Sequence, residues 1–464
     1  MDKAVEYFEP AAPIPRNTPP SGLDVVRVTM RNPLELWGEP SYNEPVIQAR
    51  FFGQHLTIAN HPGLVRHVLV DNAARYGMQP VRQLVLKPIL REGLLTAEGE
   101  NWKRSRKAMA PVFTPRHARG FAQQMLAQSV AFADRLEEDA SRASEINASA
   151  LMTQLTYEVL AETLFSGGIA RSDGDLGELI DNLLKTMGRV DPMDLIQAPR
   201  WIPRLLRLRG LKTLRGFRDM VSRTMDQRKA EIASGKQVPD DFLTLLLGLE
   251  GEAGLNRNEI EDNILTFIGA GHETTARALG WTLYCLAGSP HFRSLVEEEI
   301  DRVLATGADP VEWLDLMPHV RSAFEEAMRL YPPASNIGRA PLEDDSWTDE
   351  NGKRYDLPAG EAVVVLPWVL HRHNLYWENP RQYRPERFLP GAREKIGRFQ
   401  YLPFGAGPRI CIGATFALQE AAIALATLLG RFRFDMTENT RPWPVQRLTV
   451  QPAGGLPMRI SHRH

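Results

Sequence analysis

The most informative part of the chain is the ten-residue stretch Phe404-Gly405-Ala406-Gly407-Pro408-Arg409-Ile410-Cys411-Ile412-Gly413. It places one of only two cysteines in a glycine-rich loop. The residues that follow, 414–425, are mostly strong helix formers and include no proline, so we expect a helix to begin just after Cys411. A thiol at a helix N-terminus lies among unpaired N–H groups at the positive end of the helix dipole, which favours the thiolate.

The residues around Cys411 favour a ligand role over the ordinary alternative of a buried structural cysteine. Gly405, Gly407 and Gly413 let the backbone pass close to a bulky group and point N–H groups at the sulfur. Arg409 supplies a cation for an acidic group on the same ligand. A single thiolate in such a cage suits haem iron.

The stretch resembles the haem-binding loop of the cytochromes P-450, Phe-x-x-Gly-x-Arg-x-Cys-x-Gly, and matches it at every fixed position. The resemblance covers essentially the whole chain and implies the fold of that family, which is mainly α-helical with a minor β-sheet region. It also implies haem b as the cofactor, with Cys411 as the iron ligand. Phe404, Gly405, Arg409 and Gly413 would surround the haem.

The periodicity of the chain independently indicates a mostly helical protein with a small sheet. Helical spacing runs from about Pro111 to Ile300, with breaks at Gly167-Gly168, Asp191-Pro192 and Gly251. Strand patterns occupy 46–52, 55–59, 361–366, 448–452 and 458–460, with hairpin turns at Gly53-Gln54 and Asn351-Gly352. We expect residues 1–464 to form a single domain that includes a proline-rich lead at 1–40.

Composition narrows the class of protein further. The chain has 464 residues, of which 43% are hydrophobic, enough for a large core. A net charge of −2 gives no bulk attraction to nucleic acid, and two cysteines cannot form a disulfide framework. The N-terminus lacks the basic start and apolar run of a signal peptide, and no stretch of about 18 apolar residues occurs. We therefore expect a cytoplasmic monomer without a membrane anchor.

A second motif lies in the long helix predicted for residues 260–275. Gly269-Ala270-Gly271 removes side-chain bulk at mid-helix, and Glu273-Thr274-Thr275 places an acid and two hydroxyls beside it. The glycines alone would be read as a packing notch for a crossing helix; the adjacent acid and alcohol favour function. The segment resembles the oxygen-binding signature of the family at Ala270, Gly271, Glu273 and Thr274. That resemblance implies that Thr274 hydrogen-bonds dioxygen and that Glu273 relays protons from solvent.

A third motif is Glu326 followed three residues later by Arg329, on a helix that Pro332-Pro333 ends. By itself this spacing is that of an ordinary surface ion pair. The family pairs such a site with an arginine in a later Pro-Glu-Arg-Phe element, here Arg387. The resemblance implies a Glu326–Arg329–Arg387 triad with a structural role near the haem loop.

Haem also needs donors for its two propionates. Trp102 and Arg106 are spaced four apart, so on a helix both can reach one ligand. They resemble the Trp-x-x-x-Arg element of the family, and Arg339 stands where many relatives carry a propionate arginine. We expect His371 and His373 to lie on the surface.

The segment around Trp102 is otherwise basic, through Lys103, Arg104 and Lys107. A charge run is usually only a solvated helix face. This one should lie near Cys411, where an acidic electron carrier could dock.

The resemblance implies a haem-thiolate monooxygenase that activates dioxygen and hydroxylates a small molecule. The electrons would come ultimately from NAD(P)H, through a separate reductase and a ferredoxin or flavodoxin. Two alternatives remain: a haem-thiolate enzyme that uses or rearranges peroxides, and a non-catalytic haem sensor or carrier. Members that use peroxide tend to lose the acid and alcohol that this chain keeps.

The sequence does not identify the substrate. The expected pocket is mainly apolar, which implies a lipophilic molecule such as a fatty acid, terpene, steroid or aromatic compound. Its expected lining comprises 78–95, 187–201, Phe267, Ala270, Ala334 to Ile337, and the tail near Val450.

Overall fold

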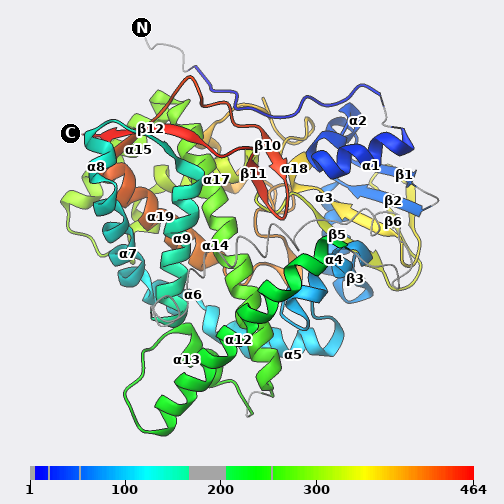
Figure 1. Ribbon diagram of the computed structural model, residues 1–464. Helices are drawn as coiled ribbons and strands as arrows, with labels where there is room; N and C mark the ends of the chain where they lie inside the picture. The colour runs from blue at the N-terminus through cyan, green and yellow to red at the C-terminus, as the bar shows by residue number, and fades with distance from the viewer. Residues whose placement is uncertain (1–5, 19–20, 52–53, 167–204, 252–253, 464) are drawn as a thin grey trace.

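The computed structural model describes residues 6–18, 21–51, 54–166, 205–251 and 254–463, and in this part of the chain helices predominate (Figure 1). The mainly helical fold predicted from the sequence is confirmed. The α-helices are α1 (Gly22–Arg31), α2 (Glu39–Asn43), α3 (Pro62–Arg66), α4 (Pro80–Leu90), α5 (Gly99–Met109), α6 (Pro115–Gly120), α7 (Ala122–Arg135), α8 (Glu137–Ser141), α9 (Ala148–Phe165), α12 (Leu205–Ala233), α13 (Phe242–Leu247), α14 (Arg257–Ala287), α15 (Pro290–Ala305), α16 (Trp313–Leu316), α17 (Pro318–Leu330), α18 (Pro367–Leu370) and α19 (Ala414–Arg431).

The strands form small sheets, the largest of which lies beside the helical body on the right of Figure 1. That sheet has the order β1-β2-β8-β5-β3; it is antiparallel except where β2 pairs with β8. The others are β4-β12-β9, β10-β11 and the hairpin β6-β7. The strands are β1 (Val46–Phe51), β2 (Gln54–Ala59), β3 (Tyr76–Met78), β4 (Glu145–Asn147), β5 (Ile337–Pro341), β6 (Asp345–Thr348), β7 (Arg354–Leu357), β8 (Ala362–Val365), β9 (Phe432–Met436), β10 (Pro444–Gln446), β11 (Val450–Pro452) and β12 (Pro457–His462).

The predicted strand segments near the start and end of the chain are confirmed as β1, β2, β8, β11 and β12. The turn at Asn351-Gly352 joins β6 to β7, and Gly352 has a positive φ of 82°, which its lack of a Cβ permits. The sequence did not predict β4, which interrupts the helical region with three residues that pair only with β12. The predicted breaks at Gly167-Gly168 and Asp191-Pro192 and the pocket segment 187–201 lie outside the described residues.

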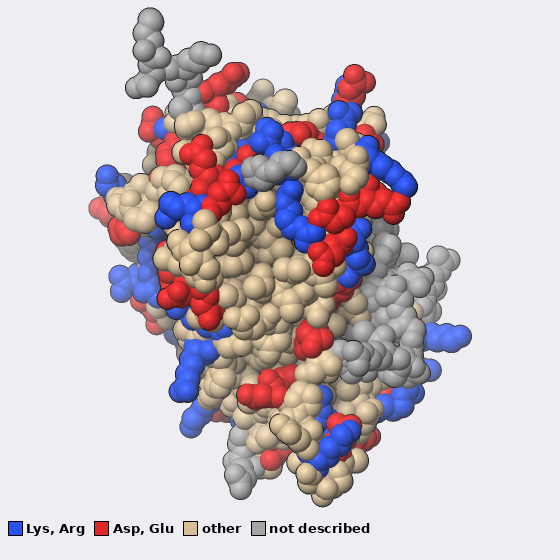
Figure 2. Space-filling view, turned by 90° about the vertical axis from the view of Figure 1, so that its left-hand side faces the viewer, with Lys and Arg blue, Asp and Glu red and all other residues tan. Residues whose placement is uncertain are grey.

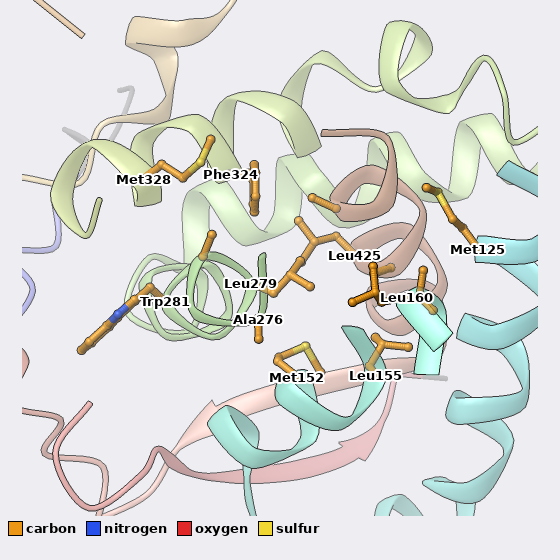
Figure 3. Packing of buried hydrophobic residues seen from close by; sticks show 14 of the residues in the cluster. Met125, Met152, Leu155, Leu160, Ala276, Leu279, Trp281, Phe324, Met328 and Leu425 are labelled. Carbon is orange, nitrogen blue, oxygen red and sulfur yellow. The ribbon is translucent and has the colours of Figure 1, made fainter. Parts of the chain in front are cut away.

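The long helix α14 forms the axis of the core (Figure 3). A capping box starts it: the Asn256 side chain accepts from the Glu259 N–H, and the Glu259 carboxylate accepts from the Asn256 N–H. The helix packs against α9 and α17 through buried apolar side chains. In Figure 3, Ala276 and Leu279 of α14 lie between Met152 and Leu155 of α9, Phe324 of α17 and Leu425 of α19, whereas Trp281 points away from this junction.

The surface has a mixed charge pattern that agrees with the small net charge. On the face drawn in Figure 2, Lys and Arg side chains are interspersed with Asp and Glu, and no block of one sign covers it. None of the helices in the described part of the chain combines the length and apolar composition that crossing a bilayer requires.

Candidate functional site

A cavity of about 1070 Å³ separates α14 from the loop that leads into α19. This volume lies at the upper end of what small-molecule pockets usually offer, so it has room for more than a small ligand. The following residues predicted for the site line it: Trp102, Arg106, Phe267, Ala270, Gly271, Thr274, Ala334, Ile337, Arg339, Phe404, Gly405, Arg409, Cys411 and Gly413. Glu273 and the residues of the predicted triad are not part of this lining.

The loop holds Cys411 in place through backbone contacts. The Cys411 N–H donates to the carbonyl of Phe404 at 2.9 Å, and α19 begins three residues later at Ala414. Gly407 has a φ of 72°, and a Cβ there would lie 1.8 Å from the carbonyl oxygen of Leu69. Glycine is therefore required at this position, because the loop presses directly against the preceding backbone.

The Cys411 side chain is exposed to the cavity but enclosed by protein on its other sides. Burial raises the pKa of its thiol, while a hydrogen bond from the Gly413 backbone and the positive charge of Arg106 lower it. The position of Cys411 just before a helix predicted a thiolate. In the protein itself, however, burial has the larger effect and raises the pKa of the thiol. Coordination to a metal ion deprotonates such a thiol outright.

Donors for an acidic ligand gather at one side of the cavity. The guanidinium of Arg409 stacks on Trp102, with its central carbon 4.4 Å from the ring centroid, and its Nη2 donates to the carbonyl of Ala97 at 2.9 Å. Arg106 follows Trp102 by four residues on α5 and also faces the cavity. Arg339 lies on β5, where its Nη1 donates to the carbonyl of Gly338 at 3.0 Å.

Thr274 of α14 also lines the cavity. Its Oγ1 donates to the carbonyl of Ala270 at 2.9 Å, one turn earlier in α14. The chain is α-helical through Gly269-Ala270-Gly271. A Cβ on Gly271 would lie 3.4 Å from Leu160 of α9, which is an ordinary van der Waals distance, so the packing of the two helices does not require glycine at this position.

Glu273 points away from the cavity, although it is adjacent to Thr274 in the sequence. It is buried, and its Oε1 accepts a hydrogen bond from Thr449 at 2.8 Å. Arg277 lies 3.6 Å from the same oxygen, while Oε2 has no hydrogen-bond partner among the described residues. Sequence reasoning missed Thr449, because nothing in the residues near it signals a contact with a carboxylate 176 positions earlier.

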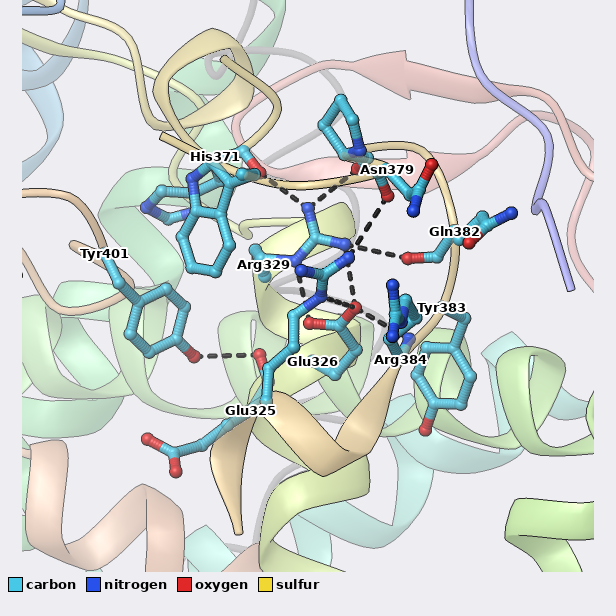
Figure 4. Close-up of polar contacts among 12 residues, drawn as sticks. Glu325, Glu326, Arg329, His371, Asn379, Gln382, Tyr383, Arg384 and Tyr401 are labelled. Atoms are coloured by element: carbon cyan, nitrogen blue, oxygen red, sulfur yellow. Dashed lines mark hydrogen bonds and ion pairs between the residues drawn. The ribbon is translucent and has the colours of Figure 1, made fainter. Parts of the chain in front are cut away.

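Glu326 and Arg329 form a fully buried ion pair (Figure 4). Arg329 donates from Nε and Nη2 to the two carboxylate oxygens, both at 2.7 Å. The remaining donors of Arg329 reach the carbonyls of His371, Pro380 and Gln382 at 2.6, 2.8 and 2.9 Å. The Nε of Arg387 lies 3.6 Å from Glu326, so the structure brings the three predicted residues together.

The surface positions expected for the two histidines were wrong. His371 and His373 are both fully buried, and burial lowers the pKa of each imidazole. The Nε2 of His371 accepts from the N–H of Leu402 at 2.8 Å, while its carbonyl accepts from Arg329. His371 therefore connects the Glu326–Arg329 pair to the chain entering the Cys411 loop.

Glu420 is a buried acid that the sequence did not reveal, because it lies in a predicted core helix. It is hydrogen-bonded by Thr275, and burial raises the pKa of its carboxyl to about 8. This contact joins α19 to α14 behind the cavity wall.

The basic residues beside Trp102 are not equivalent. Lys103 and Lys107 are exposed, and Lys103 pairs with Glu100 at 2.7 Å. Arg104 instead forms an ion pair with Glu259 at the start of α14. A docking partner could therefore bind Lys103 and Lys107 without breaking the ion pair that joins α5 to α14.

The residues around the cavity fit a haem. Cys411 offers one soft ligand on one wall, and the apolar residues of α14 leave the opposite wall open. Trp102, Arg106 and Arg409 supply donors for carboxylates at the side of the same space. A Cβ built on Gly413 would meet no atom of the described residues within 4 Å, which leaves room beside the sulfur.

Comparisons with known proteins agree with this arrangement. The family described as Cytochrome P450 matches residues 39–458. The chain is 31% identical to cytokinin hydroxylase of Arabidopsis thaliana over 86% of this chain and 77% of that protein. It is 30% identical to cyclooctatin synthase of Streptomyces melanosporofaciens over 92% and 91% of the two chains.

Among solved structures, the cytochrome P450DA heme domain has the same fold, with a TM-score of 0.81 and 24% identity over 98% of this chain and 99% of that one. Family match, relatives and fold thus agree over nearly the full length described. The chain therefore belongs to the cytochrome P450 family and is a haem monooxygenase.

Proposed function

We propose that the protein hydroxylates a lipophilic small molecule with dioxygen and two electrons, supplied from NAD(P)H through a separate ferredoxin or flavodoxin. One observation carries this proposal: Cys411, from the loop before α19, and Thr274, from α14, line the same cavity. A metal ligand and a proton donor are thereby separated by the space in which cofactor, dioxygen and substrate would lie.

Haem b, when bound, supplies the redox chemistry that activates oxygen. Cys411 is the proposed iron ligand, held by the Phe404 carbonyl contact and by the start of α19. Trp102, Arg106 and Arg409 are proposed to bind the propionates, with Arg339 as a further donor from β5; all four line the cavity. Phe404, Gly405 and Gly413 line the remainder of the cofactor space.

Thr274 and Glu273 are proposed to deliver protons. The Thr274 hydroxyl can turn from the Ala270 carbonyl toward the cavity and donate there. Glu273 acts from behind α14: its Oε2 can hold a proton while Oε1 remains bound by Thr449. This arrangement makes Thr274 the group that contacts the reacting species and Glu273 the source that recharges it.

The triad of Glu326, Arg329 and Arg387 is proposed to be structural. It fixes the segment through His371 and Leu402 that leads into the Cys411 loop. We propose that the whole chain, including residues 1–40, forms one haem domain. A lipophilic substrate is proposed because Phe267, Ala270, Ala334 and Ile337 offer it apolar contacts.

The test compares Thr274→Val with Thr282→Val. Both threonines donate to a carbonyl one turn earlier in α14, but Thr282 is buried away from the cavity. With an electron-transfer chain and a hydroxylated test substrate, Thr274→Val should release more peroxide and less product per NADPH consumed. Thr282→Val should keep the wild-type ratio.

Equal product per NADPH in wild type and Thr274→Val would remove Thr274 from proton delivery and favour a route that uses peroxide. Product formation that does not consume NADPH in any variant would support the same alternative. No substrate oxidation under any electron supply would favour a haem sensor or carrier.

A further inference from the structure

Trp281 and Tyr331 form the closest aromatic contact in the described part of the chain. Their rings are nearly parallel, at 5°, with centroids 3.8 Å apart, and both side chains are fully buried. Two neutral aromatic rings prefer an offset or edge-to-face arrangement with centroids about 4.5–7 Å apart, because their faces carry the same partial negative charge. The observed face-to-face stack becomes favourable if one ring carries a positive charge, since a cation is attracted to the face of its neighbour.

The stacked pair lies directly behind the wall of the cavity. Ala278, three residues before Trp281 in α14, lines the cavity, and three residues of helix rise only about 4.5 Å. Pro333, two residues after Tyr331, lines the cavity as well. Figure 3 shows the Trp281 side chain pointing away from the apolar junction of α9, α14, α17 and α19. The pair is therefore close to the cofactor space without occupying it.

Three other tryptophans are covered by a positive charge. The central carbon of an arginine guanidinium lies over the ring of Trp102 at 4.4 Å, of Trp368 at 3.8 Å and of Trp377 at 4.9 Å from the centroid. A cation at this distance opposes the loss of an electron from the indole, because the oxidised ring would itself be positive. Among the described residues, no Lys or Arg lies over Trp281. Trp281 is therefore easier to oxidise than these three residues.

The hydrogen bonds of the stacked pair hold its protons in place. The Nε1–H of Trp281 donates to the carbonyl of Val450 at 3.1 Å, and the Tyr331 hydroxyl donates to the carbonyl of Ala11 at 2.7 Å. A backbone carbonyl accepts a hydrogen bond without removing the proton, and its negative end favours positive charge on the donor ring. Burial raises the pKa of the Tyr331 hydroxyl well above its usual value, and Arg372 lies 5.7 Å over the Tyr331 ring. An electron is therefore lost more readily from Trp281 than from Tyr331.

Tyr284 connects the stacked pair to the N-terminal segment. Its ring centroid lies 5.9 Å from that of Trp281, and its hydroxyl accepts from the N–H of Ala11 at 3.4 Å. Phe8 packs edge-on against the Tyr284 ring, with centroids 5.4 Å apart. Both Phe8 and Ala11 are only half-buried, so a small reductant in solvent can approach to within one aromatic ring of Trp281.

We propose that Trp281, stacked on Tyr331, is an electron donor that discharges the haem centre when activated oxygen meets no substrate. In each event Trp281 loses one electron and the haem centre gains it; the indole keeps its N–H proton, so no bond in the side chain breaks. Two such events, with two protons from solvent, release the activated oxygen atom as water. An external one-electron reductant such as ascorbate returns each electron to Trp281 through Tyr284. This protective activity is additional to hydroxylation and rests only on the proposed binding of haem in the cavity.

The test follows radicals in the haem-loaded protein without substrate. The ferric protein is mixed with peracetic acid, frozen within milliseconds and examined by electron paramagnetic resonance. We expect a free-radical signal that narrows when the protein contains ring-deuterated tryptophan and keeps its width with ring-deuterated tyrosine. Trp281→Phe should lose most of this signal. The matched control Trp368→Phe should keep it, because that ring is equally buried but lies under Arg372.

Two further measurements test the protective role and keep the test decisive if Trp281→Phe does not bind haem. Under repeated additions of peracetic acid, ascorbate should slow the loss of haem absorbance in wild type, and this protection should be lost in Trp281→Phe. In wild type without ascorbate, peptide mass spectrometry should find oxygen added to Trp281 rather than to Trp37 or Trp102, which line the cavity themselves. Tyr331→Phe keeps the stacked ring and should retain the tryptophan signal.

The inference is wrong if no tryptophan radical forms, if Trp281→Phe keeps the signal, or if oxygen is added to Trp37 or Trp102 instead. Loss of the signal in Tyr331→Phe would move the electron donor to Tyr331 and would also contradict it. These outcomes differ from a failure of the proposed function, because peracetic acid supplies the oxygen and neither substrate nor electron-transfer partner is present. A protein that hydroxylates its substrate from NADPH without a radical on Trp281 would keep the proposed function and lose only this inference.

Discussion

Breaking the Glu326–Arg329 pair should destabilise the protein far more than breaking an exposed pair of the same spacing. Both side chains of this pair are fully buried, and Arg329 makes five hydrogen bonds of 2.6–2.9 Å. Arg329→Met would leave a buried carboxylate with only the N–H of Arg384 at 2.8 Å and the more distant Arg387. Removing one partner of such a pair costs about 3–5 kcal/mol.

That loss is large against a total stability of roughly 5–15 kcal/mol for a folded domain. The matched control is Lys103→Met, which breaks an exposed i,i+3 pair with Glu100 and should cost at most about 1 kcal/mol. Urea unfolding followed by tryptophan fluorescence, with haem content measured in parallel, gives both differences. Glu326→Gln should destabilise in the same range as Arg329→Met.

The double variant Glu326→Gln/Arg329→Met tests the cause. Because it removes both charges of the buried pair together, its loss of stability should be smaller than the sum of the two single losses. Additive losses would show that Glu326 and Arg329 act independently. A loss below about 1 kcal/mol for Arg329→Met would refute the reasoning from buried charge.

Three other predictions concern the cavity and its surroundings. Cys411→Ala should abolish the red-shifted band of the reduced carbon monoxide complex, whereas Cys285→Ala should keep it; the reverse result would move the iron ligand to Cys285. Lys103→Glu/Lys107→Glu should slow turnover with an acidic ferredoxin and weaken the dependence of turnover on salt, because both lysines are exposed beside the proposed propionate donors. Substrate affinity should not change. Unchanged turnover would mean that the partner docks elsewhere. Burial raises the pKa of Glu420 from 4.5 to about 8, so the folded state holds a proton that the unfolded chain releases, and stability should fall as pH rises through about 8. Glu420→Gln should weaken the pH dependence of the urea midpoint in this range, and an unchanged pH dependence would contradict the raised pKa of Glu420.

The mainly helical fold could be predicted because its signals are local. The glycine loop before α19, the helical period of α14 and the turn between β6 and β7 each depend on neighbouring residues. By contrast, β4 consists of three residues whose only reason to be extended is pairing with β12, more than 300 positions later. No local pattern encodes such a partner.

The same distinction explains what the sequence could not show about the site. Glu273 lies in the helix that the sequence predicts, but the direction of its carboxylate depends on a hydrogen bond from Thr449, which is far away in the sequence. The sequence suggests that His371 is exposed, because the residue is polar. In the structure it is buried, since its ring accepts a hydrogen bond from Leu402 and its carbonyl accepts one from Arg329. Burial of a polar residue follows from partners that only the folded chain brings together.

These partners make the position of the thiol depend on residues far from it. The Arg329 guanidinium holds the His371 carbonyl, and the His371 ring holds the N–H of Leu402, two residues before Phe404. The Phe404 carbonyl in turn accepts from the Cys411 N–H. Since the contacts of Arg329 with His371 and of His371 with Leu402 are buried, we expect a change at Arg329 to shift the loop. We therefore expect the buried ion pair to help position Cys411, the proposed iron ligand, although neither of its residues lines the cavity.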